Sequence, residues 1–225
     1  MNNSVTNTAR LLGAGLRALL VLTLLCGVLY PLAVTGVAQA LFHDKANGSE
    51  IEAHGKVVGS ELIGQRYDLP LKRGQKTPAP DLRWFQPRPS NGLGENSVNT
   101  DHKLLLSGAT NLAGASEELI AQVKEAKAAV IRDNSTASHK INPADVPADA
   151  VTSSGSGLDP HISPAYAALQ AHRVAEKNHL SVPRIQHLIT QNTTPRTLGF
   201  LGEPRVNVLR LNLALKELTS HSPIP

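Results

Sequence analysis

The sequence predicts an α+β protein in which one N-terminal transmembrane helix precedes a single soluble domain that mixes helices and strands. Residues 18–42 form a run of 25 residues without a charge, which as a helix would measure about 37 Å and could cross a bilayer. Residues 116–134 and 163–178 carry helical patterns, and residues 56–65 carry β-branched residues interrupted by glycines. Because these elements follow one another without regular βαβ alternation, we expect the α+β class.

The composition argues against several classes of protein. Hydrophobic residues make up 41% of the chain and aromatic residues only 3%, so the core must be aliphatic. The net charge of +4 is scattered, without the basic face and stacking aromatics of nucleic-acid-binding proteins, so we expect no nucleic-acid partner. The single cysteine, Cys26, allows no disulfide within the chain and no thiolate metal site. The nine histidines follow no zinc-binding spacing, and we expect no metal.

The apolar run has two interpretations. Pro31 lies near its middle, after Tyr30, and a proline in a membrane helix is tolerated where a neighbouring helix covers the freed carbonyl. We therefore expect a retained anchor that contacts a partner helix around Tyr30 and Pro31. The alternative is a signal peptide cleaved after Ala40, which would release a soluble periplasmic binding protein. The run is longer than the 7–15 residues of a usual signal core, which favours the anchor.

Charges on either side of the run predict its orientation. Arg10 and Arg17 precede it, and no acidic residue occurs before Asp44. The positive-inside rule then places residues 1–17 in the cytoplasm and residues 43–225 outside it. In a bacterium the chain would be a single-pass protein of the inner membrane with a periplasmic C-terminal domain.

Three serines mark the predicted starts of helices in the soluble domain. Ser116 is followed by two glutamates, and Ser163 by a proline, as expected of N-cap residues. Ser181 begins a third helix, with a proline two residues later. Residues 133–146 are polar and predict a surface loop.

Two further stretches are less regular. Residues 68–94 contain five prolines and predict an extended loop, and the aromatic pair Trp84 and Phe85 within it is interpreted as a plug that seals this loop onto the core. At the C-terminal end, leucines alternate over residues 205–218 and predict a strand that passes into a terminal helical turn. These leucines are Leu209, Leu211, Leu213 and Leu215.

The stretch GSGLDPHISP, residues 155–164, is the one place where catalytic residue types gather. A hydrolase using Ser156, Asp159 and His161 is the alternative function that it suggests. These residues are too close in sequence for the usual triad, and the G-x-S-x-G elbow is absent. A metal would find candidate ligands at Asp159 and His161, with His172 as a third, and we interpret this grouping as chance.

The same stretch could instead bind an anion or simply turn the chain. The glycine-rich backbone at residues 154–157 could point amides at a phosphate, close to the start of a helix. The Walker pattern is missing, however, and Asp159 would repel the anion. The local residues favour a turn in which Gly155 and Gly157 take unusual dihedral angles, Asp159 bonds nearby backbone and Pro160 fixes the bend.

Several ordered motifs resemble the family of C subunits of Kdp-type potassium-transporting ATPases (KdpC). The resemblance extends from the anchor to about residue 218. It rests on Tyr30-Pro31, GSELIGQ at 59–65, WFQPRPS at 84–90, SGATNL at 107–112, VPADAVTSSGSGLDPHISP at 146–164, Arg173-Val174-Ala175 and LGEPRVNVLRLNLAL at 201–215. The chain departs from the family in having Trp84-Phe85 where Tyr-Phe is usual.

The resemblance implies a non-catalytic accessory subunit of a high-affinity, ATP-driven potassium-uptake complex. Its partners would be a channel-like potassium-translocating subunit, a P-type ATPase subunit and a small single-helix subunit, with membrane lipid around the anchor. The family is described as a catalytic chaperone that raises the ATP affinity of the ATPase subunit. The chain lacks the DKTGT motif of P-type pumps, so no cofactor of its own is expected and ATP would belong to the ATPase subunit.

The resemblance also suggests site residues. Nucleotide-contact candidates are Ser154, Gly155, Ser156, Gly157 and Gln170, and partner-contact candidates are Tyr30, Pro31, Trp84, Phe85, Asp159 and His161. On local pattern alone, Gln170 is an ordinary exposed helix residue. An external domain also conflicts with direct contact to cytoplasmic ATP. If the domain is external, we expect it to stabilise the channel-like subunit or cover its potassium entrance.

Overall fold

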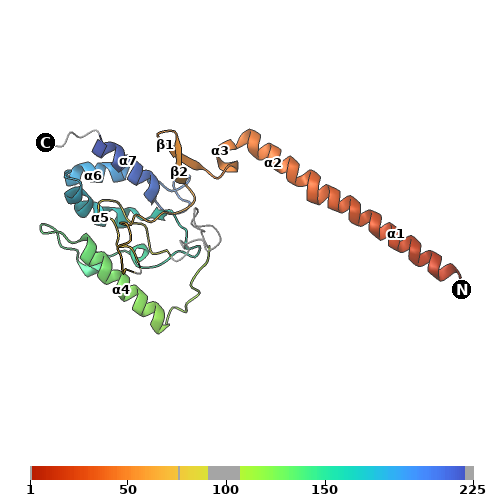
Figure 1. Cartoon of the computed structure of the whole chain (residues 1–225), viewed down its shortest axis with the longest axis horizontal. Coiled ribbons are helices and arrows are strands. Elements are labelled where there is room, and N and C mark those ends of the chain that lie inside the picture. Colours follow the sequence, from red (N-terminus) through yellow and green to blue (C-terminus); the bar gives the residue numbers. More distant parts are fainter. Residues whose placement is uncertain (1, 76, 91–106, 221–225) are drawn as a thin grey trace. The chain divides into compact units, whose positions relative to one another are not determined.

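The structure is a computed structural model of the whole chain that describes residues 2–75, 77–90 and 107–220. The chain divides into two units, residues 1–50 and 51–225, and each is described by itself. Residues 91–94 of the expected loop 68–94 lie outside the described residues. Figure 1 shows the chain, with labels on many of its elements.

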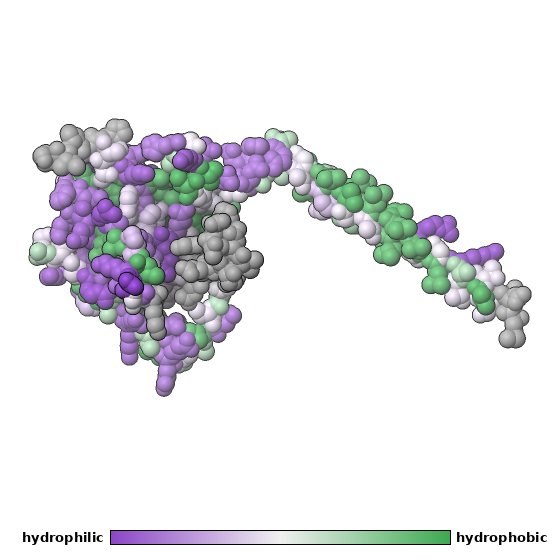
Figure 2. Space-filling model, in the orientation of Figure 1, coloured by the Kyte–Doolittle hydropathy of each residue, from purple (hydrophilic) through white to green (hydrophobic). Residues whose placement is uncertain are grey.

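The first unit is a long apolar helix. It comprises α1 (Asn2–Leu24), a π-helical turn η1 (Leu25–Leu29) and α2 (Tyr30–Leu41), followed by the short α3 (His43–Ala46). Residues 4–41 are long and apolar enough to cross a membrane, and Figure 2 shows hydrophobic residues along much of this rod. The expected span of 18–42 lies in this helix except for its last residue, Phe42, and residues before 18 are helical as well.

The π-helical turn lies directly before the proline. The amide of Tyr30 donates to the carbonyl of Leu25, five residues earlier, whereas Pro31 has no amide hydrogen to donate. The wider turn therefore accommodates the proline within a helix that continues to Leu41. Tyr30 is exposed on this helix.

The second unit contains two small sheets. Strands β1 (Glu50–Ala53) and β2 (Lys56–Ser60) form one of them. Strands β3 (His161–Ile162), β4 (Thr193–Thr194) and β5 (Arg205–Asn207) form an antiparallel sheet of order β3-β5-β4. His161 pairs with Asn207, and Thr194 with Arg205. Together with the helices, these sheets confirm the mixed α+β class.

Four α-helices and two short 3₁₀ turns complete the described part of this unit. They are α4 (Glu117–Asn134), η2 (Pro143–Asp145), η3 (Ala148–Ala150), α5 (Pro164–Lys177), α6 (Val182–Gln191) and α7 (Val208–Ser220). The predicted caps are confirmed at two starts, where Ser116 Oγ accepts from the Leu119 amide and Ser163 Oγ from the Tyr166 amide. Ser181 occupies the N-cap position of α6.

The predicted C-terminal strand is wrong for most of its length. Only Arg205–Asn207 is a strand, and the following residues form α7. The alternating leucines also fit a helix, because the face that α7 buries repeats at helical spacing. That face consists of Val208, Leu209, Leu211, Asn212 and Leu215.

The predicted loop at 133–146 is only partly at the surface. Asn134, Thr136 and Ile141 are buried, and residues 143–145 form a 3₁₀ turn. The Ile141 amide donates to Ser135 Oγ, directly after the end of α4, a contact that the polar composition alone does not reveal.

The core is mainly aliphatic, as the composition requires, and centres on α5, α6, β5 and α7. Phe85 is completely buried in it although it comes from the proline-rich segment, and Trp84 packs against the same cluster. The plug interpretation of this aromatic pair is therefore confirmed. Since Phe85 exposes no surface, it offers no contact to another subunit in this conformation.

Candidate functional site: a clamped strap beside the GSGLDPHI turn

Residues 84–90, here called the strap, are held to the helices by side-chain amides. The Gln170 carbonyl oxygen accepts from the Gln86 amide at 2.7 Å, and its nitrogen donates to the Gln86 carbonyl at 3.1 Å. Asn212 of α7 holds Phe85 in the same two-sided way, with both distances 2.9 Å. Such pairing replaces the hydrogen bonds that an extra strand would make. The strap is thus fixed without belonging to a sheet.

Arg173 joins three segments beneath the strap. Its guanidinium donates to Asn134 Oδ1 on α4 at 2.8 Å and to Gln170 Oε1 on α5 at 2.6 Å. It also donates to the carbonyls of Trp84, at 2.9 Å, and Leu82. Burial lowers the pKa of Arg173 to about 10, which leaves the side chain charged at neutral pH. A buried cation is therefore held entirely by neutral oxygens at these four contacts.

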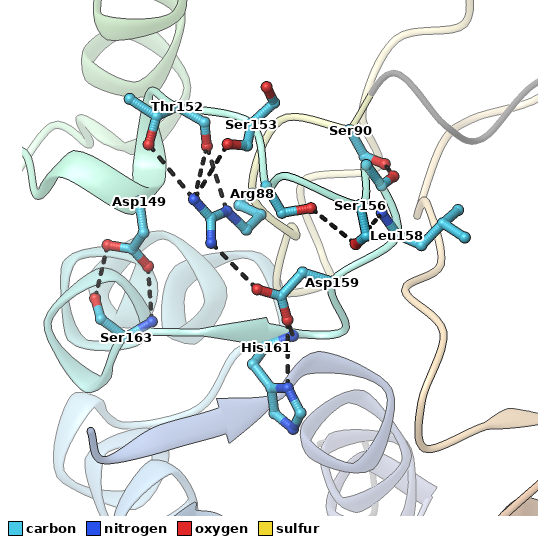
Figure 3. Close-up of polar contacts among 12 residues, drawn as sticks. Arg88, Ser90, Asp149, Thr152, Ser153, Ser156, Leu158, Asp159, His161 and Ser163 are labelled. Atoms are coloured by element: carbon cyan, nitrogen blue, oxygen red, sulfur yellow. Dashed lines mark hydrogen bonds and ion pairs between the residues drawn. The ribbon is translucent and has the colours of Figure 1, made fainter. Parts of the chain in front are cut away.

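Arg88, near the C-terminal end of the strap, connects the strap to the GSGLDPHI turn, residues 155–162 (Figure 3). Its NH1 group lies 3.1 Å from Asp159 Oδ2, and its other nitrogens donate to the carbonyls of Thr152 and Ser153. Asp159 also accepts from the His161 amide at 2.9 Å, while its Oδ1 lies 3.3 Å from His161 Nδ1. One carboxylate thus connects the strap to strand β3.

The environment of Asp159 keeps it ionised. Burial alone would raise the pKa of its carboxyl group. The hydrogen bonds from the side chain and backbone of His161, together with Arg88, outweigh burial, and the pKa lies below its usual value. The pair with Arg88 is therefore a formed ion pair at neutral pH.

The glycine-rich turn is bound by three segments that are distant in sequence. The Gly64 amide donates to the Leu158 carbonyl at 2.7 Å, and the Gly108 amide to the Ser156 carbonyl at 2.9 Å. The Ser90 hydroxyl donates to the Gly157 carbonyl. The motifs at 59–65, 84–90 and 107–112 therefore meet at this turn.

Within the turn, the serine and glycine groups are used locally. Ser156 Oγ accepts from the Leu158 amide at 3.1 Å and lies 3.2 Å from Ser154 Oγ, and the Gly157 amide donates to the Ser154 carbonyl. Gly157 has a φ of 68°, whereas Gly155 is not among the residues with positive φ. The turn interpretation is confirmed, but the expectation of an unusual dihedral angle at Gly155 is wrong.

The hydrolase residues are not arranged as a triad. Asp159 and His161 contact each other, but in the described part of the chain the Ser156 hydroxyl has its partners at Ser154 and Leu158. Among the described residues no group of three His, Cys, Asp or Glu side chains is placed to hold a metal ion. His172 instead stacks on His139, with ring centroids 3.8 Å apart.

The nucleotide-contact candidates lie in two separate environments. Ser156 and Gly155 are exposed on the turn, whereas Gln170 has 0% exposed surface and uses both ends of its amide on Gln86. The interpretation of Gln170 as an exposed helix residue is therefore wrong. A nucleotide could reach it only if the strap moved away.

Sequence reasoning missed the side chains that organise this site. Arg88, Arg173 and Asn212 were not singled out for these roles, although each lies in a motif that carries the family resemblance. One signal was present: Arg173 falls among the alanines and valine of the apolar face of α5, where a charged residue needs polar partners. Its partners come from distant segments and leave no local pattern.

Comparison with known proteins identifies the family of the chain. The family profile described as KdpC, K+-transporting ATPase, c chain, matches residues 12–217. The chain belongs to the KdpC family. That match includes most of the apolar helix, the strap, the turn and the side chains that hold the strap, namely Gln170, Arg173 and Asn212. The family assignment therefore applies to the whole site, and the resemblance seen in the sequence is confirmed.

Individual relatives support the same assignment. Proteins named potassium-transporting ATPase KdpC subunit from Streptomyces avermitilis and Streptomyces coelicolor are 72% and 68% identical, over 99% and 98% of this chain and 100% and 98% of their own lengths. The Mycobacterium tuberculosis protein of that name is 45% identical over 90% of this chain and 96% of its own. The family, and the single helix among the described residues that is able to cross a membrane, together indicate a single-pass membrane protein.

Proposed function

We infer that this chain is the accessory KdpC-type subunit of an ATP-driven potassium-uptake complex of the P type. One observation carries the proposal, namely the family match from within the apolar helix to the end of the soluble domain. Relatives that match over nearly their full length are named as subunits of a potassium-transporting ATPase. The strap and the turn would then be parts of a docking module.

The geometry of the turn supports a non-catalytic role. The Ser156 hydroxyl is engaged with Ser154 and Leu158, and Asp159 is engaged with Arg88 and His161. A serine nucleophile needs its base within hydrogen-bonding reach, and in the described part of the chain the Ser156 hydroxyl has its contacts with Ser154 and Leu158, not with His161. These contacts support a structural role for all three residues.

We place the N-terminus in the cytoplasm and the α+β domain outside it. Arg10 and Arg17 precede the charge-free run, and acidic residues first appear after it. The anchor would be retained in the inner membrane, with Tyr30 and Pro31 facing a partner helix. The exposed position of Tyr30 on the helix supports this contact.

The partners would be the channel-like, P-type ATPase and small single-helix subunits of one complex. We propose that the external domain acts through the channel-like subunit, and that any gain in ATP affinity reaches the ATPase subunit through the complex. Two observations support this indirect route. Gln170 is buried under the strap, and the amides of Gly157 and Leu158 donate hydrogen bonds within the turn.

Copurification tests the subunit assignment. With an affinity tag on the P-type ATPase subunit, we expect the wild-type chain to copurify in a fixed ratio and to be required for potassium-stimulated ATP hydrolysis. A complex that contains the double variant Ser156→Ala and His161→Ala should keep potassium-stimulated ATP hydrolysis, provided that the variant still assembles with the other subunits. Hydrolytic activity of the isolated chain, lost in that assembled variant, would contradict the proposal.

Protease accessibility tests the orientation. In intact spheroplasts, added protease should digest the domain after residue 42 and leave a short membrane-protected fragment. Digestion only after lysis would place the domain in the cytoplasm and restore direct nucleotide contact. Mass spectrometry of the untreated chain distinguishes a retained anchor from a cleaved signal peptide, because cleavage after Ala40 would remove residues 1–40 and with them nearly all of the apolar run.

A further inference from the structure

A short hairpin between β4 and β5 presents an apolar tip to solvent. Leu198 is 79% exposed, Phe200 68% and Leu201 50%. These three residues, here called the apolar tip, follow one another within four positions and lie outside the described hydrophobic core. Contiguous apolar groups at the surface of a folded domain mark sites of interaction.

The tip is held in one shape by its own backbone. Thr197 and Leu201 exchange hydrogen bonds of 2.9 Å in both directions, and the Gly199 and Phe200 amides donate to Arg196 and Thr197 carbonyls. Leu198 and Gly199 take left-handed φ values of 54° and 82°. A residue such as Leu198 keeps that angle only where its surroundings impose it. The tip is therefore preorganised for binding.

The backbone of the tip is also prepared for an apolar environment. The amides of Thr197, Gly199, Phe200 and Leu201 all find carbonyl partners inside the loop. Buried amides without partners would oppose removal from water, and these four would remain satisfied. The loop can thus insert as a unit without new backbone hydrogen bonds at these positions.

The base of the hairpin is polar and anchored. Arg196 NH2 lies 2.7 Å from Glu203 Oε2, and both side chains are largely exposed. Beyond them the two arms enter the three-stranded sheet, where β5 is the central strand. An apolar centre with a polar rim is the arrangement of protein–protein interfaces.

We propose that the apolar tip docks into an apolar pocket on another subunit of the same potassium-transporting complex. The occupant is a protein rather than lipid because the charges nearest the tip in the described hairpin, Arg196 and Glu203, neutralise each other, and the remaining charge, Arg205, lies in β5 within the sheet. A membrane-binding loop would instead present a net positive charge to anionic headgroups. The rigid shape also suits a pocket of fixed form. This inference rests on the proposed function and names the surface through which that subunit docks.

Photocrosslinking at the tip tests the inference in the assembled complex. Phe200 is replaced by p-benzoylphenylalanine in the full chain, the complex is irradiated, and crosslinked peptides are identified by mass spectrometry. We expect a crosslink to an apolar stretch of another subunit. A crosslink only to lipid, to a second copy of this chain, or to nothing would overturn the inference.

A charge substitution provides the second readout. Phe200→Asp should weaken retention of the chain in the detergent-purified complex by about tenfold or more, as expected of a central apolar anchor residue. Leu71→Asp, at a site that is 56% exposed, is the matched control and should be retained like the wild type. Equal thermal melting of both variants establishes that the fold is intact. Equal retention of both variants would overturn the inference.

The two proposals fail in different ways. If the wild-type chain does not copurify with the other subunits, the proposed function fails. If the wild-type chain copurifies but Phe200→Asp is retained equally and position 200 gives no crosslink to a subunit, the docking inference fails and the subunit assignment stands.

Discussion

The side-chain amide of Gln170 hydrogen-bonds both the amide and the carbonyl of Gln86, 84 residues earlier in the chain. The same Gln170 oxygen also accepts from Arg173. With 0% of its surface exposed, Gln170 acts as the link between α5, the buried cation and the strap. Because Gln170 lies in the interior, we expect its replacement to lower the stability of the domain rather than to remove a direct contact with a ligand.

Replacing Gln170 should destabilise the domain. Gln170→Ala removes the two bonds to Gln86 and one to Arg173, leaves buried groups without partners and creates a cavity. We expect a loss of about 2–4 kcal/mol in the free energy of unfolding, measured by urea denaturation of the full chain in detergent. Gln186→Ala, on the exposed side of α6, should change it by less than about 0.5 kcal/mol. Equal stability of the two variants would contradict the role of Gln170 in holding the strap to α5.

Two glycines of the turn region should respond differently to alanine. A Cβ atom on Gly64 would lie 2.8 Å from the Asp159 carbonyl oxygen, too close without backbone movement, whereas one on Gly155 would have no neighbour within 4 Å. We expect Gly64→Ala to cost about 1–3 kcal/mol and Gly155→Ala to be neutral or slightly stabilising. Thermal melting measures both, and an equal effect would show that residues 59–65 do not pack on the turn.

The Arg88–Asp159 pair predicts a loss of stability in acid. Because the pKa of Asp159 is lower in the folded chain than its usual value, its contribution is present above about pH 4 and is lost as pH falls through the folded-state value. Asp159→Asn should cost about 1–3 kcal/mol at pH 7 and reduce the decline in stability below pH 4. Denaturation series at several pH values measure this, and an unchanged decline would assign the effect to other carboxylates such as Asp81.

The stacked histidines predict a second pH dependence. Burial, with a smaller contribution from His139, lowers the pKa of His172. The unfolded chain therefore takes up the proton first, and this contribution to stability is complete above about pH 6.5 and declines as pH falls below it. His172→Gln should flatten the stability profile between about pH 6.5 and 5, whereas His187→Gln, on the exposed side of α6, should leave it unchanged. Thermal melting across this range decides between them.

Local features of the fold were predictable from the sequence. Ser116 and Ser163 begin helices through hydrogen bonds to residues three positions later, so the cap and its partner appear together in the sequence. The apolar run was recognisable from its length. The GSGLDPHI turn was also recognised correctly, because Asp159 bonds an amide only two residues away.

Tertiary features were not predictable in the same way. The alternating leucines from Leu209 to Leu215 fit a strand and a helix equally. The helix α7 is the conformation that packs their buried face against the core. The burial of Gln170 depends on the strap, which comes from a proline-rich segment without periodicity. The ion pair between Arg88 and Asp159 likewise joins residues 71 positions apart. A single sequence contains no pattern that pairs these two residues.

The two hydrogen bonds between Asn212 and Phe85 join residues 127 positions apart. They therefore constrain the order in which parts of the domain can fold during synthesis. Translation must reach α7, close to the C-terminus, before this aromatic ring can be locked in place. Contacts of such long sequence separation form late and slowly. A newly made chain will therefore leave Phe85 without its Asn212 contacts until synthesis is almost finished, and a chain shortened before residue 208 would hold the strap only through the contacts of Gln170, Arg173 and Arg88.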